Sequence, residues 1–88
     1  NALQPENPRM LAALGYTWHQ LGESQKAVTF LEQSVQLAPT FALAWYHLGN
    51  AQAEIGDKNA AIESFKVAVQ LQPNFTIAKD ALRNIEGR

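Results

Sequence analysis

The sequence of 88 residues contains no cysteine, so disulfide bonds and thiolate metal sites are excluded within this chain. Charged residues make up only 17% of it, and seven basic residues are balanced by eight acidic ones. Like charges do not form runs, which argues against a phosphate-tracking nucleic-acid surface and against a polybasic membrane anchor. No apolar stretch approaches the roughly 20 residues of a membrane-spanning helix. The sequence therefore predicts neither a nucleic-acid nor a membrane partner.

Residue groupings typical of catalysis or metal binding are also missing. The two histidines, His19 and His47, are separated by far more than one helical turn, and no acidic residue has metal-ligand spacing to either. Glu54 and Asp80 could approach each other on neighbouring helices, but two solvated surface acids are the simpler interpretation. We therefore expect no catalytic site, no metal and no cofactor in this chain.

What the chain does contain is a repeat of 34 residues. Residues 8–41 align with residues 42–75 without a gap, and the matching pairs include Leu14 with Leu48, Gly15 with Gly49, Gly22 with Gly56, Ala27 with Ala61, Pro39 with Pro73 and Phe41 with Phe75. A fixed period of this size is typical of stacked supersecondary units, each of which buries its apolar face against its neighbours. Such an array presents an extended surface, so we expect function in binding.

The second copy shows the clearest motif. It reads Trp45-x-x-Leu48-Gly49-x-x-Gln52, then Ala61-x-x-x-Phe65-x-x-Ala68, and closes at Pro73. This resembles the tetratricopeptide repeat, in which two antiparallel helices, A and B, form each unit. The first copy departs by Leu11 for Trp and Ser34 for Ala, and the second by Gln52 for Tyr. The resemblance implies an all-α fold, a right-handed superhelix (solenoid) of antiparallel helix hairpins.

Local signals indicate where these helices begin and end. Gly22 and Gly56 follow the A helices, where a left-handed cap favours glycine, and Pro39 and Pro73 stop the B helices. Asn7, Thr40 and Asn74 are predicted to cap the A helices. The packing side of the A helices is expected to carry Leu11, Leu14, Trp18 and Leu21 in the first copy and Trp45, Leu48, Ala51 and Ile55 in the second. We expect Gly15 to lie against Ala27, and Gly49 against Ala61, where two helices approach closely.

The remaining segments extend the register at both ends. Residues 1–7 resemble the tail of a preceding repeat, and residues 76–88 are expected to form a capping helix. Its apolar stripe comprises Ile77, Ala78, Ala81, Leu82 and Ile85, and its outer positions are Lys79, Arg83 and Glu86. At the other end, Met10, Leu14 and Trp18 form an edge predicted to be exposed and to permit self-association.

In the tetratricopeptide family the A helices line the concave side of the superhelix. The resemblance therefore implies that partner-binding residues lie on that face, namely Arg9, Ala12, Ala13, Tyr16, His19, Gln20, Leu43, Tyr46, His47, Asn50, Glu54, Ile77, Asp80 and Asn84. An ordinary solvated face is the alternative interpretation. Tyr16, Tyr46, His47 and Asn50 are the strongest candidates because tyrosine offers contact area and Asn and His can bond a peptide main chain. We expect Tyr46 and Asn50 to point away from the core, and His47 to titrate near pH 6.5.

Two known ligand modes of the family find no match here. A clamp for acidic chaperone tails would need Lys, Asn or Arg where Ala12, Tyr16, His47, Ile77 and Ala81 stand. An asparagine ladder would need Asn at Ala13, His47 and Ala81. The sequence therefore favours a protein-interaction scaffold or adaptor that binds some other protein or peptide segment, with a structural or self-associating role as the alternative and no enzymatic activity.

Overall fold

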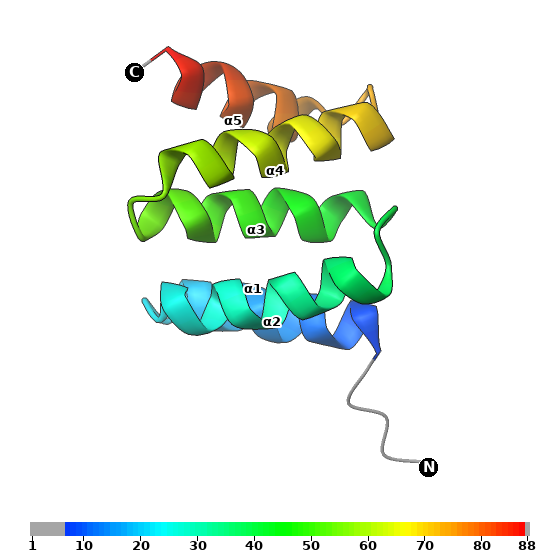
Figure 1. The fold of residues 1–88 in the computed structure, drawn as a ribbon, viewed down its shortest axis with the longest axis vertical. Coiled ribbons are helices and arrows are strands. Elements are labelled where there is room, and N and C mark those ends of the chain that lie inside the picture. Colours follow the sequence, from blue (N-terminus) through cyan, green and yellow to red (C-terminus); the bar gives the residue numbers. More distant parts are fainter. Residues whose placement is uncertain (1–6, 88) are drawn as a thin grey trace.

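The computed structural model describes residues 7–87, and these residues form five α-helices and no strand. The helices are α1 (Pro8–Gln20), α2 (Ser24–Leu37), α3 (Ala42–Glu54), α4 (Lys58–Leu71) and α5 (Thr76–Glu86). They stack along the long axis of an elongated body, with α1 and α2 at one end and α5 at the other (Figure 1). The extents of this body are 45 × 27 × 17 Å.

Each short connection joins two packed helices. α1 and α2 form one hairpin and α3 and α4 form the next, while α3 also packs on both α1 and α2, and α5 packs on α4. The predicted all-α helical-repeat solenoid is confirmed. Residues 1–6, which belong to the predicted tail of a preceding repeat, lie outside the described residues.

The turns inside the hairpins follow the predicted glycine chemistry. Gly22 and Gly56 have φ angles of 84° and 90°, in the left-handed region where a side chain would be strained. Leu21 and Ile55 immediately precede them as C-cap residues and are exposed, so the expectation that they belong to the packing stripe is wrong. Beyond the last helical turn a side chain no longer shares the face of the residues three and four positions earlier.

The helix starts are partly as predicted. Asn7 caps α1, because its side-chain oxygen accepts hydrogen bonds from the backbone N–H groups of Arg9 and Met10 at 2.9 and 3.2 Å. The predicted caps Thr40 and Asn74 are wrong: the N-cap residues of α3 and α5 lie one residue later, at Phe41 and Phe75, and neither makes a side-chain cap. The cap position is displaced because the chain first makes a turn, in which the Phe41 N–H donates to the carbonyl of Ala38.

Close helix contact inside each hairpin depends on a glycine. A β-carbon built on Gly15 would lie 2.4 Å from Cγ of Leu31, and one built on Gly49 would lie 2.6 Å from the ring of Phe65. The residues nearest to these glycines are therefore Leu31 and Phe65, one helical turn beyond the predicted Ala27 and Ala61. Since Leu31 and Phe65 are both buried, the glycines provide the space that these large side chains fill.

The buried apolar residues form two clusters. The larger one joins the first hairpin to α3 and contains Ala12, Ala27, Val28, Leu31, Val35, Ala44, Leu48 and Ala51. The smaller one joins α3 and α4 to α5 and contains Ala61, Phe65 and Ile85. On α5, Ala78 and Ile85 face inward as predicted, Ile77 is exposed, and the outer residues Lys79, Arg83 and Glu86 are exposed. The core therefore runs through the whole stack, as nearest-neighbour packing of repeats requires.

Two departures from the repeat motif are explained by hydrogen bonds. The hydroxyl of Ser34, which replaces alanine, donates to the carbonyl of Pro8 at 2.8 Å and ties α2 to the start of α1. Gln52, which replaces tyrosine, accepts a 2.6 Å hydrogen bond from the hydroxyl of Ser64, and both side chains are buried. Buried polar groups need such partners, so each departure is satisfied within its own hairpin.

Candidate functional site

A row of rings crosses the side of the molecule that α1, α3 and α5 share. The ring centroids of Tyr16 on α1 and His47 on α3 are 5.0 Å apart, and those of His47 and Tyr46 are 5.5 Å apart. The ring of Tyr46 also lies 5.4 Å from that of Phe75, the N-cap residue of α5. All three pairs are tilted, a favourable arrangement for aromatic rings. We call Tyr16, His47, Tyr46 and Phe75 the aromatic row.

A second link between α1 and α3 lies next to this row. His19 Nε2 is 3.8 Å from the Glu54 carboxylate, so a protonated His19 forms an ion pair with it. Burial of His47, with a smaller contribution from the nearby charge of His19, lowers the pKa of His47 below its ordinary value of 6.5. The expectation of an unperturbed titration is therefore corrected. His47 is neutral near pH 7 and can accept or donate a hydrogen bond there.

An open hollow of about 210 Å³ lies between α3 and α5. Its lining residues are Asn50, Ala53, Phe65, Ala81, Asn84 and Ile85. The ring of Phe65 also lies 6.0 Å from that of Tyr46, so the hollow and the aromatic row share a wall. Asn50 and Asn84 bring one carboxamide each from opposite sides, and each carboxamide offers two donors and an acceptor. A lining of apolar residues together with two amides suits an amino-acid side chain and its main chain.

The structure unites some predicted site residues and separates others. Tyr16, His19, Tyr46, His47 and Glu54 form one connected group, and Asn50 and Asn84 meet at the hollow. The remaining predicted residues Arg9, Ala13, Gln20, Leu43, Ile77 and Asp80 are exposed. Glu54 and Asp80 are both exposed, in line with the interpretation of two surface acids. Asp80 lies 3.2 Å from Arg83 of its own helix, and Glu54 faces His19.

Two assignments to the binding face need correction. Ala12 is only 4% exposed and belongs to the larger core cluster, because it lies at the contact of α1 with the second repeat. Tyr46 is half-buried and packs against the smaller cluster, so its ring is shared between the surface and the core. The expectation that Tyr46 points away from the core is wrong.

Several residues of the site were not predicted from the sequence. Phe75, Phe65, Ala53, Ala81 and Ile85 complete the row and the hollow. Phe75 carried a usable signal, since it recurs 34 residues after Phe41 at the start of an A helix. Among residues 7–87, no cluster of three or more potential metal ligands occurs. In the same part of the chain, every helix is too short or too polar to cross a membrane.

The fold and this surface define an α-helical repeat protein. Two sequence profiles, both described as tetratricopeptide repeat, match residues 8–41 and 42–75. The chain belongs to the tetratricopeptide repeat family. No sequence among the curated proteins matches it significantly.

Solved structures extend this comparison, and 67 chains match. One is the first tetratricopeptide domain of Spaghetti (RPAP3) bound to the HSP90 peptide SRMEEVD, with TM-score 0.92, 21% identity, 96% of this chain covered and 67% of that one. The second domain of human RPAP3 in complex with the HSP70 peptide SGPTIEEVD gives TM-score 0.90, 21% identity and coverages of 97% and 71%. The crystal structure of MamA gives TM-score 0.89 and 33% identity over 93% of this chain and 48% of MamA. The chain thus spans about half the length of MamA.

Proposed function

We propose that this chain is a protein-interaction module that binds an extended segment of a partner across α1, α3 and α5. The carrying observation is the aromatic row, which runs from Tyr16 through His47 and Tyr46 to Phe75 and adjoins the hollow. Rings that pack on one another lose little further freedom when a ligand covers them, so they offer contact area at low entropic cost. The tetratricopeptide domains of RPAP3 that bind peptides support the same class of role.

The chemistry of the surface narrows the ligand. The hollow is several times larger than the roughly 30 Å³ of one water, so an apolar or aromatic side chain of the partner is proposed to enter it. Asn50 and Asn84 at its rim then hydrogen-bond the main chain beside that side chain. The aromatic row supports the next residues of the segment by apolar contact.

Acidic tails are disfavoured as ligands in this proposal. The HSP90 and HSP70 peptides held by RPAP3 both end in Glu-Glu-Val-Asp. In this chain Tyr16, His47, Ile77 and Ala81 stand where the resemblance would place the amide and cationic groups of a carboxylate clamp, and none of them is Lys or Arg. The lowered pKa of His47 also keeps that ring neutral near pH 7. A neutral segment with an apolar anchor fits the surface better than a carboxylate does.

The proposed role is non-catalytic. His19 faces Glu54, and His47 lies between two tyrosine rings, so both imidazoles take part in packing or pairing at the surface. One such groove provides less area than a standard interface, and we expect affinities of roughly micromolar or weaker. The activity of any longer protein that carries these repeats lies outside this proposal.

A peptide selection tests the proposal directly. A random peptide library displayed on phage is selected on the immobilised chain, and the enriched peptides are titrated calorimetrically. The test variant carries Asn50→Ala with Asn84→Ala, and the control carries Gln33→Ala with Gln70→Ala on the exposed side of α2 and α4. We expect peptides with an apolar anchor, a loss of affinity of about tenfold or more in the test variant and no change in the control, since two buried hydrogen bonds are lost.

Two further measurements test the ligand class and the location of the binding site. The peptide SRMEEVD is titrated in parallel and is expected not to bind. Backbone chemical shifts of the complex should change around Tyr16, His47, Asn50 and Asn84. Shift changes confined to α2 and α4, or equal affinity of the test and control variants, would move the binding site to the opposite side.

A further inference from the structure

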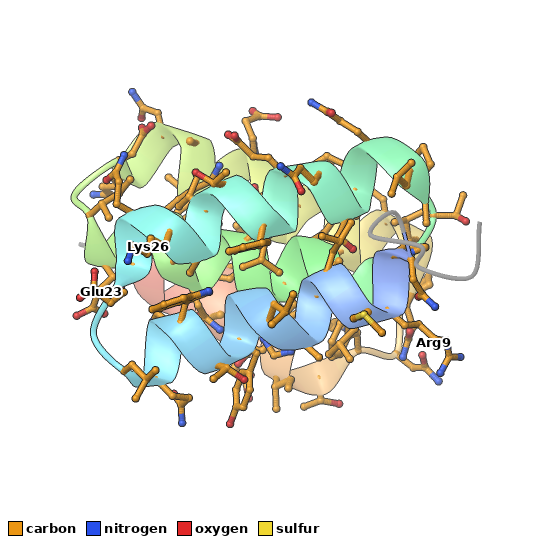
Figure 2. All side chains as sticks on the ribbon, turned by 90° about the horizontal axis from the view of Figure 1, so that it is seen from below. Arg9, Glu23 and Lys26 are labelled. Atoms are coloured by element: carbon orange, nitrogen blue, oxygen red, sulfur yellow. The ribbon has the colours of Figure 1, made fainter. Side chains whose placement is uncertain are left out.

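The outer side of the first hairpin is an exposed surface with a largely apolar centre. Met10 and Leu14 on α1 are 55% and 41% exposed, and Trp18 on α1 and Phe30 on α2 are half-buried. Lys26 places its ammonium 4.4 Å from the centroid of the Trp18 ring. Figure 2 looks onto this side of the hairpin, with α1 and α2 in front. We call Met10, Leu14, Trp18, Lys26 and Phe30 the N-terminal face.

The equivalent positions of the second repeat show what such a face does when it is packed. A shift of 34 residues maps Met10 to Ala44 and Leu14 to Leu48, which are 0% and 3% exposed. Both counterparts belong to the larger core cluster, where α3 packs on the first hairpin. The N-terminal face is therefore a second copy of a stacking surface, and no described residue of the chain stacks on it.

A more telling contrast comes from the next pair of positions. Trp18 and Phe30 correspond to Gln52 and Ser64, which are buried and hydrogen-bonded to each other. The chain thus places a polar pair where its two repeats are packed together and two aromatic side chains where the hairpin is open. If the open surface faced water, polar residues would be expected there and the aromatic pair at the packed position. Aromatic residues on an open stacking surface are typical of a contact with another protein.

We propose that a second copy of this chain covers the N-terminal face, with α1 of one copy antiparallel to α1 of the other. The charges at the rim point to this arrangement. Arg9 lies at one end of the face, and Glu23 and Lys26 lie at the other, as Figure 2 shows. The ammonium of Lys26 stands over the Trp18 ring, which leaves Glu23 as the acidic group of that end. A two-fold axis that lies in the interface and runs across the helices brings Arg9 of each copy to the end occupied by Glu23 of the other. The apolar centres of the two faces then meet.

Other pairings of two copies are less favourable. An axis parallel to the helices brings the two Arg9 side chains together at one end, away from Glu23, so like charges approach there. Head-to-tail stacking would place the N-terminal face on the outer side of α5, where Lys79, Arg83 and Glu86 are exposed. That contact would bury charges against apolar groups at a cost in free energy. The symmetric pair is the association that the described residues favour.

The size of the face limits its affinity. The molecule measures 27 × 17 Å across its two shorter axes, which bounds an end face well below the roughly 800 Å² per partner of a standard interface. We therefore expect a dimer that dissociates on the order of 10 to 100 µM and is in rapid exchange.

The oligomeric state of the 88-residue chain tests the proposal. Sedimentation equilibrium from about 5 µM to 1 mM should show a monomer–dimer equilibrium. The test variant is Trp18→Gln with Phe30→Ser, which installs in the first hairpin the polar pair that the second hairpin already accommodates. We expect its dimerisation to weaken at least tenfold while circular dichroism shows the same helix content. Lys79→Glu, on the outer side of α5, is the matched control and should dimerise like the wild type.

A charge exchange tests the antiparallel arrangement separately and does not depend on the folding of the first variant. Arg9→Glu alone and Glu23→Arg alone should each weaken the dimer, and the two together should restore it, because only then do opposite charges again face each other. A wild-type chain that stays monomeric at 1 mM overturns the proposal. A dimer that the Trp18 and Phe30 changes leave intact places the interface elsewhere, and failure of the charge exchange to restore it refutes the antiparallel geometry.

Discussion

Asn7 caps its helix, whereas Thr40 and Asn74, which were predicted to cap theirs, do not. Its side chain accepts two backbone hydrogen bonds at the start of α1, whereas Thr40 and Asn74 lie in turns that end before α3 and α5 begin. We expect Asn7→Ala to destabilise the chain by about 1 kcal/mol, because two backbone donors lose their acceptor. Thr40→Ala should change the free energy of unfolding by less than about 0.5 kcal/mol. Urea unfolding of both variants measures this, and equal losses would contradict the assigned cap.

His47 makes the stability of the chain depend on pH. Its pKa is lowered in the folded state by burial and by His19, while an unfolded histidine titrates near 6.5. Below about pH 6.5 the unfolded state binds more protons than the folded state, so stability must fall as the pH decreases. We expect unfolding midpoints measured between pH 7.5 and 5 to fall more steeply for the wild type than for His47→Gln.

A titration of the ring identifies the cause. In NMR spectra, the His47 ring signals should shift with a midpoint below 6.5, and His19→Gln should move that midpoint upward, because the nearby charge of His19 is removed. The larger part of the shift should persist, since burial is the first cause. A midpoint at or above 6.5 in the wild type would refute the burial argument.

Among the elements, α3 and α4 pack closely against each other and form the hairpin of the second repeat. Ala61 is fully buried there beside Phe65, whose ring occupies the space above Gly49. We expect Ala61→Leu to destabilise the chain by about 1–3 kcal/mol through overpacking, and Gln33→Leu, at an exposed position of α2, to change little. Thermal melts followed by circular dichroism compare the two, and equal midpoints would show that the hairpin can open to admit a larger side chain.

The elements were predictable because their signals are local. Gly22 and Gly56 adopt the left-handed conformation that glycine alone adopts freely, and the two helices of each repeat follow from apolar periodicity. The caps of α3 and α5 were misplaced by one residue, from Phe41 and Phe75 to Thr40 and Asn74. The turn after each proline is closed by a backbone hydrogen bond, from Phe41 to Ala38 and from Phe75 to Gln72. Side-chain capping preferences carry no information about such a bond.

For the whole molecule, the sequence predicted those contacts of the site that follow from the register of the A helices, and it did not predict the others. Register brings Tyr16 and His47 to adjacent positions on neighbouring A helices, and their rings do meet. The burial of Tyr46 against Phe65 depends on how α3 packs on α4, and its contact with Phe75 depends on how the chain enters α5. The sequence of the A helices alone specifies neither. The pKa of His47 likewise depends on burial between helices, a property of the assembled stack.

The hydrogen bond between Gln52 and Ser64 has a consequence for the order of the modules. It lies inside the second hairpin, so that hairpin satisfies its own polar groups whether or not a neighbour covers them. The first hairpin has Trp18 and Phe30 at the same positions, and in the proposed dimer the partner copy covers them. If the two repeats exchanged places along the chain, Trp18 and Phe30 would lie in the contact between the repeats, which is shaped around smaller side chains. The hydrogen-bonded polar pair would then lie on the exposed N-terminal side of the stack. The two 34-residue repeats are similar, yet they cannot exchange positions along the chain without loss of packing.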